Sequence, residues 1–116
     1  HATAATSERA GLPPVAQCMA CHEGVKKDSQ PIRRLAGYHK DAKPIPWVRI
    51  YQVPDYVIFS HARHAAGKLD CAACHGPVAQ REALGKEAPT DMKACMDCHQ
   101  SRGATLVCSA CHELGH

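Results

Sequence analysis

Four copies of one short motif, Cys-x-x-Cys-His, constrain this chain of 116 residues more than any other feature. The motifs occupy residues 18–22 (site 1), 71–75 (site 2), 95–99 (site 3) and 108–112 (site 4). All eight cysteines fall within them, and a histidine follows the second cysteine every time. Disulfide frameworks and zinc ribbons can use cysteine pairs at this spacing, but neither needs that histidine. The motif is typical of c-type haem attachment, so we predict four covalently bound haems.

The residues of each motif have different predicted roles. The two cysteine sulfurs would add to the vinyl groups of the porphyrin, and the histidine would become an axial ligand of the iron. The predicted attachment residues are Cys18, Cys21, Cys71, Cys74, Cys95, Cys98, Cys108 and Cys111. The predicted proximal iron ligands are His22, His75, His99 and His112. Each iron then needs one further ligand to become six-coordinate.

A chain this short has little material for a core made of protein alone. Phe, Trp and Tyr together form 4% of the sequence, while glycine and proline contribute eight residues each. Small chains with sparse cores generally depend on a covalent or metal staple. We therefore expect a mostly irregular fold with short α-helices and little or no sheet, organised around the four haems.

Two histidines just before site 2 are candidates for sixth ligands. His61 and His64 are three residues apart, so on a helix they project from neighbouring positions. One of them can complete the haem of site 2, and the other then points at a different iron. We expect a single helical turn to join two haems side by side.

Sites 1 and 4 are left without an obvious partner. The candidates are His1, His39, His116, Met19, Met92 and Met96. We predict that His39 supplies the sixth ligand of site 1, because no other internal histidine is unassigned. The alternative for His39 is a surface position in a basic loop. His1 is either a solvated residue or an axial ligand.

The order of the segments suggests three parts. Residues 1–17 form an N-terminal arm, 18–58 a module containing site 1 and a proline-rich strap, and 59–116 a core with three haem sites. The arm is expected to be extended and ordered only by docking, and a short helix is expected near residues 32–38. Prolines 44, 46 and 54 forbid a continuous helix in the strap, which can cover porphyrin faces. Trp47 is expected to pack on a haem edge.

The formal charge of +3 does not indicate nucleic-acid binding. Haem propionates would shift the net charge to roughly −1 in the oxidised and −5 in the reduced state. No run of 18 apolar residues exists, so no transmembrane segment is expected. Covalent haem is attached outside the cytoplasm, so we expect an export signal to have been removed and the chain to be periplasmic or extracellular.

The pattern from Phe59 to His64, followed by site 2, resembles the class III cytochromes c, small carriers with three or four haems. The resemblance covers residues 59–112, and the short gap between sites 3 and 4 fits the trihaem branch. It implies that His61 ligates the same iron as His75 and that His64 ligates the same iron as His99.

The chain departs from that pattern before site 3. The family places a histidine there, whereas this sequence has Asp-Met-Lys-Ala at residues 91–94. Some members use methionine near this point, so the resemblance implies Met92 as the partner of His112. The alternative is a methionine of the core. Upstream, site 1 and its strap resemble the multihaem cytochrome subunit of alternative complex III, which implies a module added to a trihaem core.

No acid–base pair, nucleophile or phosphate loop is recognisable, so function is expected to rest on the cofactors. The main interpretation is electron transfer by a multihaem carrier that docks to redox partner proteins. A second is a filament or homo-oligomer in which His1 or His116 of one chain completes a haem of the next. A third is a reductase with one open haem.

The assignment of Met92 predicts the outcome of one substitution. Met92→His should lower the reduction potential of one haem, because thioether ligation favours ferrous iron relative to imidazole. A redox titration followed by absorbance measures the potential, and any sulfur-to-iron charge-transfer band should vanish. An unchanged titration would reject the assignment.

Overall fold

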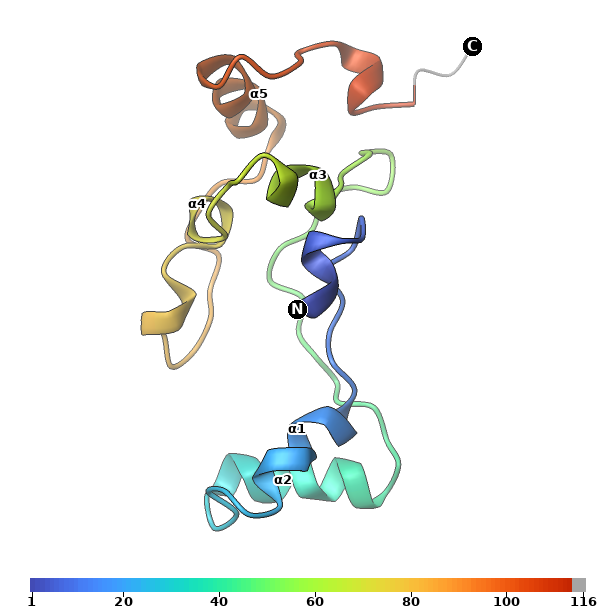
Figure 1. Ribbon diagram of the computed structural model, residues 1–116, viewed down its shortest axis with the longest axis vertical. Helices are drawn as coiled ribbons and strands as arrows, with labels where there is room; N and C mark the ends of the chain where they lie inside the picture. Colours follow the sequence, from blue (N-terminus) through green and yellow to red (C-terminus); the bar gives the residue numbers. More distant parts are fainter. Residues whose placement is uncertain (114–116) are drawn as a thin grey trace. The chain divides into compact units, whose positions relative to one another are not determined.

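The computed structural model describes residues 1–113, and its regular elements are short helices (Figure 1). The α-helices are α1 (Val15–His22), α2 (Gln30–Lys40), α3 (His61–Ala66), α4 (Ala72–His75) and α5 (Met92–Ser101). The 3-10 helices are η1 (Ala2–Ala5), η2 (Val78–Gln80) and η3 (Cys108–Ala110). Within this part of the chain β pairing is limited to one isolated bridge, between Val57 and His112. The expected fold class, mostly irregular with short helices, is confirmed.

The chain divides into two compact units. Unit 1 contains residue 1 and residues 11–48, and unit 2 contains residues 2–10 and the chain from residue 49 onward. Site 1 therefore belongs to unit 1, while sites 2, 3 and 4 belong to unit 2. The predicted boundaries after residues 17 and 58 stay predictions, since this division follows contacts within the polypeptide alone.

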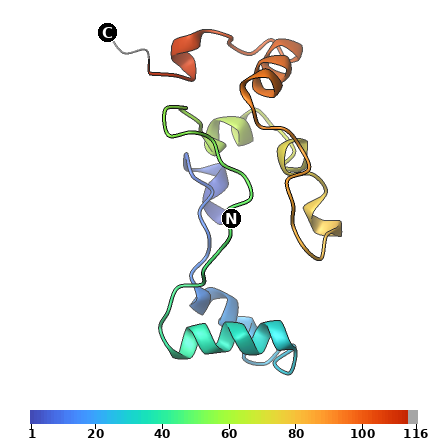
Figure 2. The same cartoon turned by 180° about the vertical axis from the view of Figure 1, so that it is seen from behind.

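Unit 1 is built on a helical hairpin. α1 and α2 lie side by side and run in roughly opposite directions, joined by residues 23–29 (Figures 1 and 2). Pro31 lies in the first turn of α2, where its fixed φ suits the helix start. The helix expected near residues 32–38 is confirmed and extends two residues further at each end, so that it includes His39. Met19 of α1 is 5% exposed and is the buried hydrophobic residue of the described chain.

Residues 2–10 of the N-terminal arm dock on α3 within unit 2, and because they contain the helix η1 the expectation of an extended arm is wrong there. η1 packs against α3, and the two lie side by side in both views (Figures 1 and 2). The carbonyl of Ser7 accepts the N–H of Ala62 at 3.0 Å, and the carbonyl of Glu8 accepts the N–H of His61 at 3.1 Å. The Ser60 hydroxyl accepts the N–H of Arg63. The arm thus satisfies donors that the first turn of a helix leaves unpaired.

The proline-rich strap contains neither helix nor strand, as its prolines predict. It joins site 4 through the backbone, where the N–H of Ile58 donates to the carbonyl of Cys111 at 2.8 Å. Trp47 is 54% exposed. Its predicted packing on a haem edge stays a prediction.

The loop after site 2 is held by polar contacts. Arg81 and Glu87 form a two-pronged salt bridge, with Arg81 Nη2 2.9 Å from Glu87 Oε2. The Tyr51 hydroxyl accepts the backbone N–H groups of Glu87 and Ala88 at 2.9 and 3.3 Å. The arginine lowers the pKa of the Glu87 carboxyl, so this link is present above the ordinary carboxyl range and is lost as pH falls through the lowered value.

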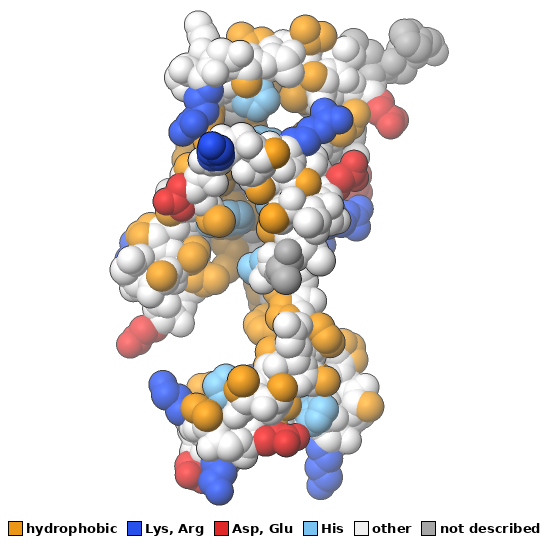
Figure 3. All heavy atoms as spheres, viewed as in Figure 1, with side chains coloured by type: hydrophobic (Ala, Val, Ile, Leu, Met, Phe, Trp, Pro, Cys, Tyr) orange, Lys and Arg blue, Asp and Glu red, His pale blue; other side chains and the backbone are white. Residues whose placement is uncertain are grey.

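Large apolar side chains are widely exposed over the described chain, as the space-filling view shows for one face (Figure 3). Val48 is 85%, Tyr56 69% and Met92 63% exposed. Soluble proteins seldom leave so many large apolar groups without apolar neighbours. These side chains suit a fold whose apolar contacts include a porphyrin. None of the helices in residues 1–113 has the length and hydropathy to cross a membrane.

Gly76 offers a test of the loop after site 2. Its φ is +69°, and a Cβ there would lie 2.8 Å from Glu87 Oε2 and 3.1 Å from Glu87 Cβ. Gly76→Ala should therefore destabilise the folded protein by about 1–2 kcal/mol, the cost of a left-handed conformation for an L-residue. Denaturant unfolding of the haem-loaded protein measures it. Gly85→Ala is the matched control, because a Cβ there meets nothing within 4 Å; equal effects of the two changes would contradict the prediction.

Candidate haem-binding sites

Each Cys-x-x-Cys-His motif falls on a helical turn. Site 1 ends α1, α4 begins after the first cysteine of site 2, site 3 lies inside α5, and η3 covers the first three residues of site 4. A helical turn brings residues separated by three and four positions to one side, so both cysteines and the histidine can face one porphyrin. None of the eight cysteines forms a disulfide in the structure, and six of them are exposed. This arrangement fits thioether attachment rather than disulfide pairing.

The structure places the rings of His61 and His75 near each other in nearly parallel planes. Their ring centroids are 6.4 Å apart and their planes differ by 8°. Two imidazoles bound to one iron from opposite sides, each at about the 2.0 Å typical of metal–imidazole bonds, would have centroids about 6.4 Å apart. The pair therefore fits a six-coordinate haem iron between the rings.

A second pair has nearly the same separation. The rings of His64 and His99 have centroids 6.1 Å apart, with planes 43° apart. Both upstream histidines therefore face motif histidines, one from site 2 and one from site 3, as the resemblance implies. α3 presents the two rings to two different sites, which suits a turn shared by two haems.

Phe59 packs against both upstream rings. It lies edge-on to His61 at a centroid distance of 4.8 Å and stacks on His64 at 4.7 Å with planes 28° apart. Aromatic contacts at these distances restrict ring rotation and add roughly 0.5–1.5 kcal/mol per pair. Phe59 thus orients two candidate ligands at once. The sequence marked this residue only as part of a resemblance.

Backbone carbonyls hold the candidate ligands through their Nδ1 atoms. His61 and His64 donate to the carbonyls of Glu8 and Ser60 at 2.9 and 2.7 Å. Three motif histidines make the same type of bond, namely His22 to Val25, His99 to Thr105 and His112 to Tyr56, at 3.1, 2.8 and 3.4 Å. A carbonyl oxygen only accepts, so Nδ1 must carry the proton and Nε2 keeps a free lone pair. Metal-bound histidines are usually oriented in this way.

His75 is held differently. The edge of the Tyr51 ring contacts it at a centroid distance of 4.7 Å, in a T-shaped arrangement. Burial, followed by the nearby His61, lowers the pKa of His75 and so favours the neutral imidazole, the form that binds iron. Tyr51 therefore links the ligand of site 2 to the loop that its hydroxyl holds. No pattern in the sequence pointed to this role.

Sites 2, 3 and 4 influence one another electrostatically. Burial raises the pKa of the Cys95 thiol, and the neighbouring Cys74 and Cys111 raise it further. Burial and then Cys98 raise the pKa of Cys74. Thiols of three different motifs are thus close enough for their charges to interact. Haems attached to them would be near neighbours.

Within residues 1–113, no ring contact pairs His39 with a motif histidine, and Met92 is exposed. His39 lies about 14 Å along α2 from Gln30, at 1.5 Å per residue, and so near the end of the hairpin opposite His22. Met92 begins α5 with its side chain 63% exposed, and Met96 is 39% exposed. His116 lies outside the described residues. The assignments of His39 and Met92 stay predictions.

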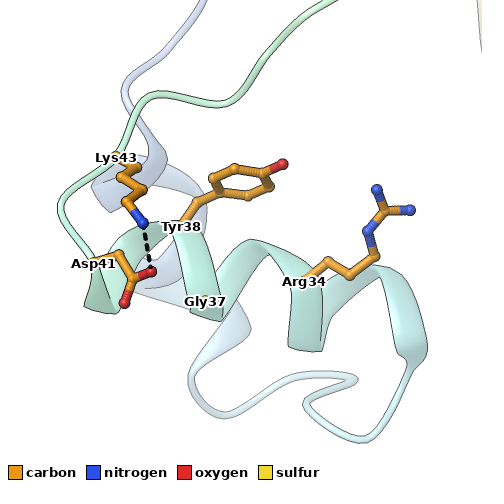
Figure 4. Close-up of a pocket in the computed structure, with 5 residues that line it drawn as sticks. All are labelled: Arg34, Gly37, Tyr38, Asp41 and Lys43. Atoms are coloured by element: carbon orange, nitrogen blue, oxygen red, sulfur yellow. Dashed lines mark hydrogen bonds and ion pairs between the residues drawn. The ribbon is translucent and has the colours of Figure 1, made fainter.

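A shallow hollow lies beside α2, away from the cysteines. Arg34, Gly37, Tyr38, Asp41 and Lys43 line it, and Lys43 pairs with Asp41 at 3.2 Å (Figure 4). Most of these side chains are exposed, and the ion pair is open to solvent, where such pairs contribute little. The hollow fits the expectation that cations of this segment lie on solvated faces.

Comparisons with known proteins agree with this geometry. Residues 57–113 match the family described as cytochrome c7 and related cytochrome c. The chain is also 43% identical over 68 residues to a protein from Nitratidesulfovibrio vulgaris named menaquinone reductase, multiheme cytochrome c subunit. That match covers 57% of this chain and 31% of the relative, so the chain spans about a third of the relative's length. Together with the four haem-attachment motifs, these similarities identify the chain as a multihaem cytochrome c whose residues 57–113 resemble the cytochrome c7 family.

Proposed function

We propose that this chain binds four c-type haems and carries electrons along them between redox partner proteins. The observation that carries the proposal is the facing of His61 with His75 and of His64 with His99. One helical turn then contributes a ligand to two irons, which keeps the two haems adjacent. Adjacent haems pass electrons without any movement of the chain.

Saturated coordination supports electron transfer rather than catalysis. An iron with two protein ligands has no open position for a substrate, and bis-histidine ligation favours a low reduction potential. The chain contributes orientation, spacing and burial, and the haem supplies the redox chemistry. Within the described residues no group of three His, Cys, Asp or Glu side chains gathers as a zinc site would require. Pairs of ligands suit a porphyrin, which itself fills four positions.

The two other haems complete the proposed chain of cofactors. His112 of site 4 has Met92 as its proposed partner, and His22 of site 1 has His39. A methionine ligand would make site 4 the haem of highest potential and so give the electrons a direction.

The named relative suggests one class of partner. It is called a subunit of menaquinone reductase, and its similarity to this chain covers 68 residues. We propose that this chain likewise acts as the electron-transferring part of a larger assembly, with quinone chemistry on another subunit. Because covalent haem is attached outside the cytoplasm, the protein would work in the periplasm or at the cell exterior.

Haem counting tests the cofactor set. The pyridine haemochrome assay, together with the mass of the intact protein, should give four covalently bound haems per chain. Replacing both cysteines of a motif by serine should remove one haem each time. A count other than four in the unaltered protein would reject the proposal.

Substitution of the two upstream histidines tests the shared turn. His61→Ala and His64→Ala should each convert one low-spin haem to high-spin, because each removes a ligand from one iron. Electron paramagnetic resonance of the oxidised protein measures the change. The double variant should show two high-spin haems. The conservative control is Arg63→Lys, on the same helical turn, and it should leave all haems low-spin. If His61→Ala also leaves all haems low-spin, the proposed pairing of His61 with His75 is wrong.

A further inference from the structure

We propose that His1 is an axial ligand of a haem iron, an assignment that rests on the proposed four-haem function. His1 belongs to unit 1, together with site 1. Its Nδ1 atom donates to the carbonyl of Gly11. As at the other histidines held in this way, the bond leaves Nε2 as the free metal-binding nitrogen.

The bond is significant because of which histidines share it. Among the eight histidines of residues 1–113, six have Nδ1 bound to a backbone carbonyl. Five of these six are His22, His61, His64, His99 and His112, each assigned to an iron on independent grounds. His1 is the sixth. His39, the other candidate without an assigned iron partner in the structure, has no such bond in the described chain.

The acceptor is supplied by a specific turn. Gly11 has a φ of +62°, in the left-handed region that glycine adopts without strain. Such a residue turns its carbonyl out of the extended path that the following prolines impose. A solvated histidine needs no acceptor of this kind, and an exposed hydrogen bond contributes little net free energy. If His1 binds iron, the hydrogen bond to the Gly11 carbonyl has a function, because it orients the His1 ring.

The chemistry that His1 offers is that of an imidazole with a fixed tautomer and an accessible Nε2. Its iron is either the haem of site 1 or another haem of the assembly, and at that iron His1 takes the place of the partner proposed above, which at site 1 is His39. The two possibilities can be told apart by measurement. Only in the first does the effect of His1→Ala on the haem spin state depend on the cysteines of site 1. Neither requires His1 to leave the carbonyl of Gly11.

The test uses the full-length, haem-loaded protein. His1→Ala should leave the haem count unchanged and convert one low-spin haem to high-spin, and that haem should bind one equivalent of carbon monoxide when reduced. His1→Met should keep all haems low-spin but raise the potential of one. Lys27→Ala is the control, because Lys27 is an exposed residue of unit 1 that takes no part in any proposed haem site; it should change neither spectrum nor potential.

The outcomes separate this proposal from the proposed function. All haems low-spin in His1→Ala, with unchanged potentials in His1→Met, would overturn the role of His1 while leaving four haems and electron transfer intact. A haem count other than four would reject the function instead. The same substitution is then made in the variant Cys18→Ser, Cys21→Ser, which lacks the haem of site 1. If His1→Ala still produces a high-spin haem there, His1 binds another haem. If it produces none, His1 binds the haem of site 1.

Discussion

The separation of His61 and His64 by one helical turn is the constraint on which the rest of unit 2 depends. Two rings at neighbouring positions of α3 face two different motif histidines, so sites 2 and 3 share one short element. α3 (His61–Ala66) has only six residues. A helix this short is not stable through intrinsic helix propensity alone. The capping carbonyls of the N-terminal arm and the ring of Phe59 hold it, and iron coordination would add two bonds to the same turn.

Backbone carbonyls determine which nitrogen each candidate ligand presents. Imidazole has two tautomers, and only one leaves Nε2 free for a metal. By accepting from Nδ1, the carbonyls of Glu8, Ser60 and Thr105 select the required tautomer without using any charged side chain. A carboxylate in the same position would favour ferric iron more strongly. The neutral acceptor leaves the potential to be set by the axial ligands and by burial.

Sequence reasoning predicted what is local and missed what is distant. The four motifs, the short helix near residues 32–38 and the irregular strap are all readable within a few residues, the motifs from their spacing and the strap from its prolines. The acceptor of His61 could not be predicted, because it is a main-chain atom of Glu8 that lies 53 positions away and carries no side-chain signal. Tyr51 was likewise hidden, since its contact with His75 depends on the path of the strap. The partners of sites 1 and 4 remain predictions because no contact in the described chain brings them to an iron.

The docking of the arm on α3 has a consequence for how the protein matures. A contact between residues 8 and 61 closes a long loop, and loop closure costs conformational entropy that only the finished fold repays. Residues of the N-terminal arm thus complete the ligand geometry of a site that lies much later in the sequence. Cofactor insertion at site 2 and collapse of the chain become one cooperative event, in which a bound porphyrin stabilises the native state by mass action.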